Sequence, residues 1–171
     1  MTDQQLCFIK DEIWLLLYAG AFQHNSIYVT HTKEYQRKAF REGLRNYIED
    51  VVHTTYNNLV SDQNHGAYIL SIIDYTRSFS QILNRGELNV GTVQKILNLS
   101  LKYYWCLDLL PEPPHFPIDR IIQKLLPASL RANWTQLQSL EDYQSIIDSV
   151  RNIKPNEMSL AAWELEYFKR N

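Results

Sequence analysis

Four of the six prolines in this 171-residue chain fall within seven positions, in the stretch "PEPPHFP" from Pro111 to Pro117. A proline removes a backbone hydrogen-bond donor and disfavours helix at the residue before it. The helix before this stretch must therefore end before Pro111, and the next helix begins after Pro117. We expect a stiff connector that crosses over and docks the short helix after it.

Before the connector, apolar residues recur at spacings of three and four, which predicts amphipathic helices. The first helix runs from about Asp3 to Phe22, and a polar loop follows from His24 to His31. Thr32 is expected to cap a second helix. A polar break from Asp62 to His65 leads into a third helix, for which Gly86 is a natural C-terminal stop.

The same pattern continues through the rest of the chain. Asn89 is expected to cap a fourth helix, which has to end before Pro111. A short fifth helix covers Ile118 to Leu125, and Ser139 opens a sixth. The last helix runs from about Glu157 to Lys169. No segment shows the alternation of a strand, so the sequence predicts an all-α protein.

Length and composition fit a single compact domain of about seven helices over residues 1–171. Hydrophobic residues make up 45% and charged residues 21% of the chain, as in ordinary globular proteins. The net charge of −2 argues against a surface that is basic all over. A local basic cleft stays compatible with it, because a sum of charges says nothing about position.

The sequence predicts a soluble cytoplasmic protein without a structural zinc ion or a cofactor. Its two cysteines, Cys7 and Cys106, lie far apart and have no metal-binding spacing, which fits a reducing compartment. The apolar run from Ile13 to Phe22 is too short to span a bilayer. We therefore expect no contact with a membrane.

Two residues on either side of the connector have the chemistry of a reactive pair. Lys95 falls in the first turns of the fourth helix, in "NVGTVQKILN", and Asp119 opens the fifth, in "HFPIDRII". An out-and-back path through the connector would bring them together across a cleft. A neutral lysine amine is a nucleophile, and a carboxylate stabilises a developing positive charge.

The stretches "VGTVQK" and "HFPIDRII" resemble two pieces of the catalytic half of the helix-hairpin-helix DNA glycosylases. They are most similar to the bifunctional 8-oxoguanine DNA glycosylase branch with an atypical hairpin. The resemblance implies that Lys95 attacks C1′ of the sugar and forms a Schiff base. It also implies that Asp119 supports proton movement and stabilises the cationic sugar. The turn here holds Gly91 alone, where the usual hairpin has two glycines.

A base-excision protein needs rings that hold an extruded base and cations that hold phosphates. The expected partner is duplex DNA with a damaged or modified base. The candidate nucleic-acid-binding residues are the turn residue Gly91, the aromatic residues Tyr104, Trp105 and Trp134, and the basic residues Lys102, His115, Arg120 and Lys124. The basic stretch from Lys33 to Arg45 is either a further phosphate-contacting face or a solvated surface.

Each of these residues also has an ordinary structural explanation. Asp119 is a favoured residue at the start of a helix, and Lys95 fits a solvated helix position. The aromatic residues fit a core. Under this alternative the chain is a small, non-catalytic helical interaction protein that binds a protein partner or oligomerises.

Overall fold

The computed structural model describes residues 1–22, 25–128, 131 and 133–168, and within these residues it is all-helical. The α-helices are α1 (Asp3–Phe22), α2 (Glu34–Thr55), α3 (Asp62–Thr76), α4 (Val90–Cys106), α5 (Arg120–Lys124), α6 (Leu140–Ile153) and α7 (Leu160–Tyr167). Two single-turn 3₁₀ helices, η1 (Arg77–Phe79) and η3 (Trp134–Gln136), accompany them. The described residues hold seven α-helices and no strand, which confirms the predicted all-α class.

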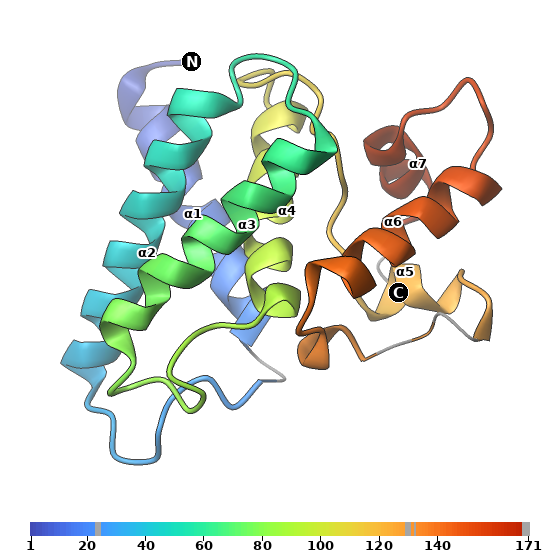
Figure 1. Ribbon diagram of the computed structural model, residues 1–171. Coiled ribbons are helices and arrows are strands. Elements are labelled where there is room, and N and C mark those ends of the chain that lie inside the picture. The colour runs from blue at the N-terminus through green and yellow to red at the C-terminus, as the bar shows by residue number, and fades with distance from the viewer. Residues whose placement is uncertain (23–24, 129–130, 132, 169–171) are drawn as a thin grey trace.

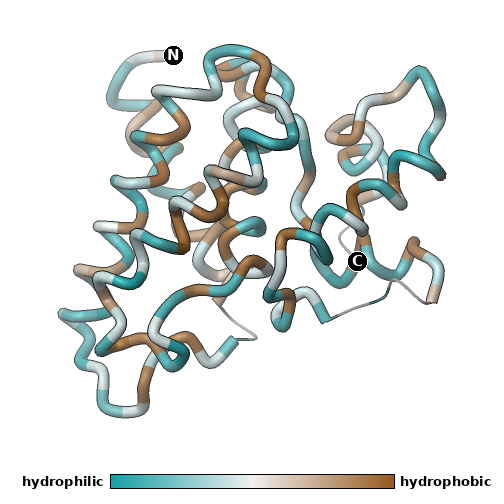
Figure 2. Tube along the Cα trace, viewed as in Figure 1, coloured by the Kyte–Doolittle hydropathy of each residue, from teal (hydrophilic) through white to brown (hydrophobic). Residues whose placement is uncertain are grey.

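Helix α4 lies at the centre of the molecule. It packs against α1 and α3 on one side and against η3 and α6 on the other, and most of its residues are buried. Figure 1 shows α1 to α4 grouped together, with α5 to α7 on the other side of the connector that follows α4. Hydrophobic and hydrophilic segments recur along the helices of the first group (Figure 2), as amphipathic helices with apolar residues at spacings of three and four require. The connector therefore joins two groups of helices through α4.

Two of the predicted helix starts are confirmed by their caps. The Asn89 side chain accepts the backbone N–H of Thr92 at 3.0 Å, and helix α4 begins at the next residue after Asn89. The Ser139 hydroxyl accepts the backbone N–H of Asp142 at 3.0 Å at the start of α6. Each cap satisfies one of the backbone donors that a helix leaves open at its N-terminus.

The predicted cap of the second helix is wrong. Helix α2 begins at Glu34, and Lys33 takes the cap position, where its backbone N–H donates to Gln36 Oε1 at 2.9 Å. The Thr32 hydroxyl donates instead to the carbonyl of Val29 at 2.8 Å. Thr32 stabilises the preceding turn, an alternative that Ser and Thr side chains commonly take.

The predicted polar break from Asp62 to His65 is also wrong, because these residues form the first turn of α3. Ser61 caps this helix, and His65 is buried. The helix ends at Thr76 and is followed by η1 and a turn, in which Gly86 has a positive φ of 75°. Gly86 therefore serves the turn and not the helix end.

The remaining boundaries differ by a few residues. Helix α5 starts two residues later than the predicted Ile118, and α7 begins at Leu160, after its cap Ser159. The predicted start of the first polar loop, His24, and the predicted end of the last helix, Lys169, lie outside the described residues. Such shifts are usual at helix ends, where caps and not periodicity fix the boundary.

Two further observations concern the cysteines and the apolar character of the helices. Both Cys7 and Cys106 are exposed and form no disulfide. No helix in the described part of the chain has the length and apolar character needed to cross a membrane.

Gly91 sets how closely α4 approaches η3. Its backbone N–H donates to the carbonyl of Leu137 at 3.0 Å. A Cβ atom at this position would lie 1.8 Å from the carbonyl oxygen of Trp134, far inside van der Waals contact. Only glycine permits this approach, which brings Trp134 onto the N-terminal part of α4.

We expect Gly91→Ala to destabilise the protein by at least about 1–3 kcal/mol, because backbone has to move to admit the methyl group. Gly66→Ala is the matched control, since the nearest atom to a Cβ there is Leu140 Cδ1 at 3.5 Å. Within α3 this change should stabilise by about 0.5–1 kcal/mol. Urea unfolding of both variants gives the free energies, and equal effects would contradict the close approach.

Candidate functional site

The structure brings Lys95, Asp119, Arg120 and Trp134 to one open pocket of about 500 Å³. Lys95 comes from the second turn of α4, Asp119 and Arg120 from the start of α5, and Trp134 from η3. The rest of the lining is formed by Ile121, Asn133 and Thr135. Four of the residues singled out in the sequence thus meet, although the connector separates them along the chain.

Lys95 is buried without an acidic partner. It is 8% exposed, and its Nζ atom lies 4.0 Å from the ring centroid of Trp134, a cation–π contact. No salt bridge joins Lys95 to any carboxylate of the described residues. Burial lowers the pKa of Lys95, and the negative charge of Asp119 opposes this shift only in part. At a given pH, a larger fraction of the Lys95 amine is therefore in the neutral, nucleophilic form than for an exposed lysine.

Asp119 is the cap of α5, and it uses one carboxylate oxygen for this task. Oδ1 accepts the backbone N–H groups of Ile121 at 2.8 Å and Ile122 at 3.1 Å. Oδ2 accepts no hydrogen bond from any described group of the protein. The structural explanation of Asp119 is thus correct, and it leaves the second oxygen for other chemistry at the pocket.

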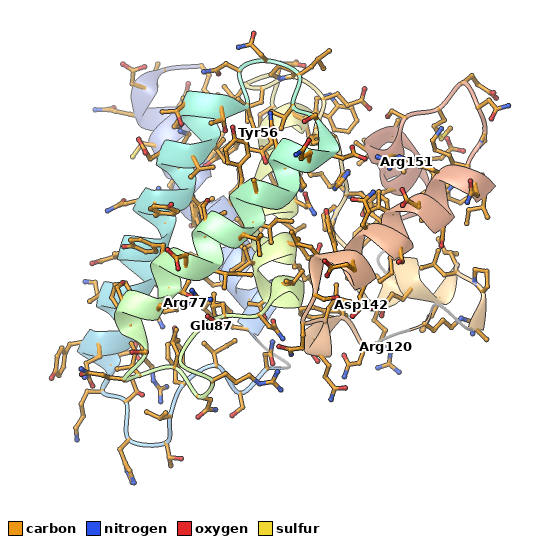
Figure 3. All side chains as sticks on the ribbon, viewed as in Figure 1. Tyr56, Arg77, Glu87, Arg120, Asp142 and Arg151 are labelled. Atoms are coloured by element: carbon orange, nitrogen blue, oxygen red, sulfur yellow. The ribbon has the colours of Figure 1, made fainter. Side chains whose placement is uncertain are left out.

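The sequence segment that supplies most of the pocket lining is basic, although the whole chain is slightly acidic. Between residues 116 and 140 the chain carries Arg120, Lys124 and Arg131, and Asp119 is the one acidic residue. Arg120 and Lys124 are exposed, and neither forms a salt bridge in the part of the chain that is described. Figure 3 shows Arg120 near α5, well away from Arg77, whose guanidinium pairs with Glu87.

The other aromatic and basic candidates on α4 lie away from the pocket. Tyr104 is 1% exposed, and its hydroxyl donates to Glu49 at 2.8 Å. Lys102 pairs with the buried carboxylate of Glu164 at 2.5 Å. Trp105 is half-buried on the same helix and does not line the pocket. The prediction that Tyr104 stacks on a base is corrected by its burial.

Three further predicted contacts also lie outside the lining. Gly91 is buried against η3, and Lys124 is exposed on α5. His115 is 0% exposed, so the structure does not place it where a phosphate could reach it. Its role is in the core, where it contacts other polar residues.

A buried polar network surrounds His115. The Tyr143 hydroxyl lies 2.8 Å from His115 Nδ1 and 3.3 Å from His65 Nε2, and the Tyr56 hydroxyl lies 2.7 Å from His65 Nδ1. At the surface end, His115 Nε2 is 3.2 Å from the carboxylate of Asp62. Burial lowers the pKa of His115 to about 4, against the opposing charge of Asp62, and it lowers the pKa of His65 well below its ordinary value. The network therefore holds two neutral imidazoles at neutral pH.

Two buried amides of α4 bind the end of the connector, and neither was predicted from the sequence as a residue of the site. Gln94 pairs with both backbone groups of Ile118: its Oε1 accepts the N–H at 3.0 Å and its Nε2 donates to the carbonyl at 2.9 Å. Asn98 donates to the carbonyl of Phe116 at 3.0 Å. The signal was present in the sequence, since two amides four residues apart on a buried helix need polar partners.

Comparison of the chain with protein-family models, with curated proteins and with solved structures finds no match in any of the three. Within the described residues, no group of three or more His, Cys, Asp or Glu side chains is arranged to hold a metal ion.

We expect the protein to lose stability as the pH falls from about 6.5 towards 4. In this window the unfolded chain protonates its histidines at their ordinary pKa of 6.5, whereas folded His115 and His65 stay neutral. The unfolded state binds more protons, so acid favours unfolding, and the stabilisation is complete above pH 6.5. For His115 the loss amounts to roughly 2–4 kcal/mol. Urea unfolding across this pH range measures it.

His115→Gln should flatten this pH dependence, whereas His31→Gln, in an exposed loop, should leave it unchanged. A wild-type stability that stays constant between pH 6.5 and 4 would contradict the neutral, buried state of both imidazoles.

Proposed function

We propose that the protein binds DNA and excises a base through Lys95 and Asp119, as a DNA glycosylase with lyase activity. One observation carries the proposal: Lys95 and Asp119 line the same open pocket, although the connector separates them along the chain. The resemblance of the stretches around Lys95 and Asp119 to the helix-hairpin-helix DNA glycosylases supports the same function.

The proposed reaction begins when the neutral amine of Lys95 attacks C1′ of the target nucleotide. The bond from C1′ to the base breaks, and the base leaves with the bonding electrons and takes up a proton. The amine nitrogen loses a proton, the ring bond from C1′ to O4′ breaks, and O4′ takes up a proton, which leaves a Schiff base between Lys95 and C1′. Burial of Lys95 favours the neutral amine that this attack requires.

Asp119 serves the charged stages of this reaction. Its negative charge stabilises the positive charge that develops on the sugar as the base departs. Its Oδ2 atom, which accepts no hydrogen bond from the described protein, then accepts the proton that the Lys95 nitrogen loses after the attack and passes it to the ring oxygen O4′. The cap to α5 holds the carboxylate in place, so little reorganisation accompanies the reaction.

Trp134 has a different part in this proposal from the one expected for it. One face of its ring is occupied by the Lys95 ammonium at 4.0 Å, so the ring cannot sandwich a base on that face. Trp134 instead favours the protonated resting state of the amine. Arg120 and Lys124 supply the phosphate contacts, and the few unpaired cations limit the contact to a short stretch of backbone.

Borohydride trapping tests the proposal on duplexes that contain 8-oxoguanine, uracil or an abasic site. Wild type should form a covalent adduct, and Lys95→Gln should abolish it because the nucleophile is gone. Asp119→Asn should slow trapping on duplexes with an intact base by about 10²-fold or more. Lys154→Gln is the matched control, since Lys154 stands at the end of α6 and does not line the pocket.

Peptide mass spectrometry should locate the adduct on Lys95. Folded wild type that forms no adduct with any of the duplexes would overturn the lyase activity. Absence of duplex binding by fluorescence anisotropy at low salt would overturn the DNA partner as well.

A second candidate is the non-catalytic interaction protein, and one observation favours it. Helix α1 exposes Phe8, Leu15 and Leu16, three large apolar side chains, on its outer surface. If the chain oligomerises through this surface, sedimentation should show a concentration-dependent mass that Leu15→Glu reduces to that of a monomer. A monomer at all concentrations would remove self-association through α1.

A further inference from the structure

Gln94 is the one residue of α4 that pairs with both backbone groups of a connector residue. It is 0% exposed, and each of its polar atoms is bonded. Its Nε2 donates to the carbonyls of Ile118 at 2.9 Å and Gly91 at 3.0 Å, and its Oε1 accepts the N–H of Ile118 at 3.0 Å. This two-point pairing fixes both the position and the direction of the connector at Ile118.

The paired residues stand immediately before the two reactive candidates. Gln94 precedes Lys95 on α4, and Ile118 precedes Asp119 at the end of the connector. Because Ile118 and Asp119 are adjacent in the chain, a displacement of Ile118 also displaces Asp119. One turn further along α4, Asn98 holds the carbonyl of Phe116 at 3.0 Å, so the connector is held at a second point.

Packing alone does not explain an amide at this position. A buried amide costs free energy unless every polar atom is bonded, and an apolar side chain would fill the space at no such cost. An apolar residue would, however, leave the buried N–H and carbonyl of Ile118 without partners. The amide is needed because the connector crosses α4 here in an extended form.

We infer that Gln94 is a positioning residue of this site, which holds Asp119 at the pocket opposite Lys95. The inference rests on the proposed function for its meaning in catalysis. Gln94 itself does not line the pocket, so it acts through Asp119. A purely structural residue would change stability and leave the effect of Asp119 on Lys95 as it is.

The first measurement is the pH profile of reductive methylation of Lys95 by formaldehyde and cyanoborohydride, followed by peptide mass spectrometry. Asp119 and Arg120 are the charged groups that line the pocket with Lys95. Removal of the Asp119 charge by Asp119→Asn should move the midpoint for Lys95 to lower pH. Gln94→Met, which keeps the length and removes the polar atoms, should move it in the same direction.

A double variant separates action through Asp119 from a general disturbance. In the Asp119→Asn background, Gln94→Met should produce no further shift of the midpoint, because the charge that it positions is absent. Ser100→Ala is the control: Ser100 is buried on α4 and its hydroxyl donates to the carbonyl of Leu97, not to the connector. This control should leave the midpoint unchanged.

The second measurement is the rate of borohydride trapping on duplexes with an intact base. Gln94→Met should slow it by about a hundredfold, the effect of a misplacement of roughly 1 Å at a reacting group. Ser100→Ala should retain the wild-type rate. Gln94→Glu, which keeps an acceptor for the Ile118 N–H, should fall between wild type and Gln94→Met, and it replaces Gln94→Met if that variant does not fold.

A Gln94 variant that lowers stability but leaves the Lys95 midpoint unchanged would overturn the inference. An additive shift in the double variant would overturn it too. If wild type forms no adduct with DNA, the proposed function fails. The methylation profile then still tests the role of Gln94. A shift of the Lys95 midpoint that depends on Asp119 supports the positioning role, and the absence of a shift refutes this role.

Discussion

The pairing of α4 with the backbone of the connector is the constraint on which the rest of the structure depends. Four prolines leave the connector without helical hydrogen bonds of its own, yet much of it is buried. Its buried backbone groups therefore need partners, and Gln94 and Asn98 supply them from the central helix. The same contacts decide where α5 begins and hence where Asp119 lies. The contacts of Gln94 and Asn98 with the connector thus determine both where the C-terminal helices begin and the geometry of the pocket.

The two explanations of Asp119 that the sequence left open are compatible with each other. A helix cap needs one acceptor oxygen, and a carboxylate has two. Because the cap is made by Oδ1, α5 orients the carboxylate without using all of it. An aspartate is better suited to this double use than serine or threonine, whose single oxygen the cap would occupy. A residue that starts a helix can for this reason also belong to a reactive site.

Local sequence signals predicted the fold well wherever local interactions decide it. The spacing of apolar residues placed α1, and the side chains of Asn89 and Ser139 marked the starts of α4 and α6. The error at the start of α3 occurred where a distant partner decides. His65 looks like part of a polar loop because its partners, among them Tyr143, are far away in the sequence.

The same distinction applies to the site. The residue types and the connector were sufficient to predict that Lys95 and Asp119 meet. The position of Trp134 was not predictable in detail, because it depends on the close contact between Gly91 and η3, which only the tertiary structure reveals. Tyr104 was misjudged for a similar reason: its hydroxyl is satisfied by Glu49, a residue of α2.

Lys95 differs from Lys10 and Lys102, two other lysines with little exposure. Lys10 and Lys102 each pair with a carboxylate, at 3.2 Å and 2.5 Å. Such pairing compensates the cost of removing an ammonium group from water. Among the described residues, the Lys95 amine contacts the Trp134 ring, and the Asp119 carboxylate is near enough to influence the pKa of Lys95 without forming a salt bridge. An apolar residue here would avoid the cost of burying an amine without a carboxylate partner, so stability alone does not favour a lysine at this position.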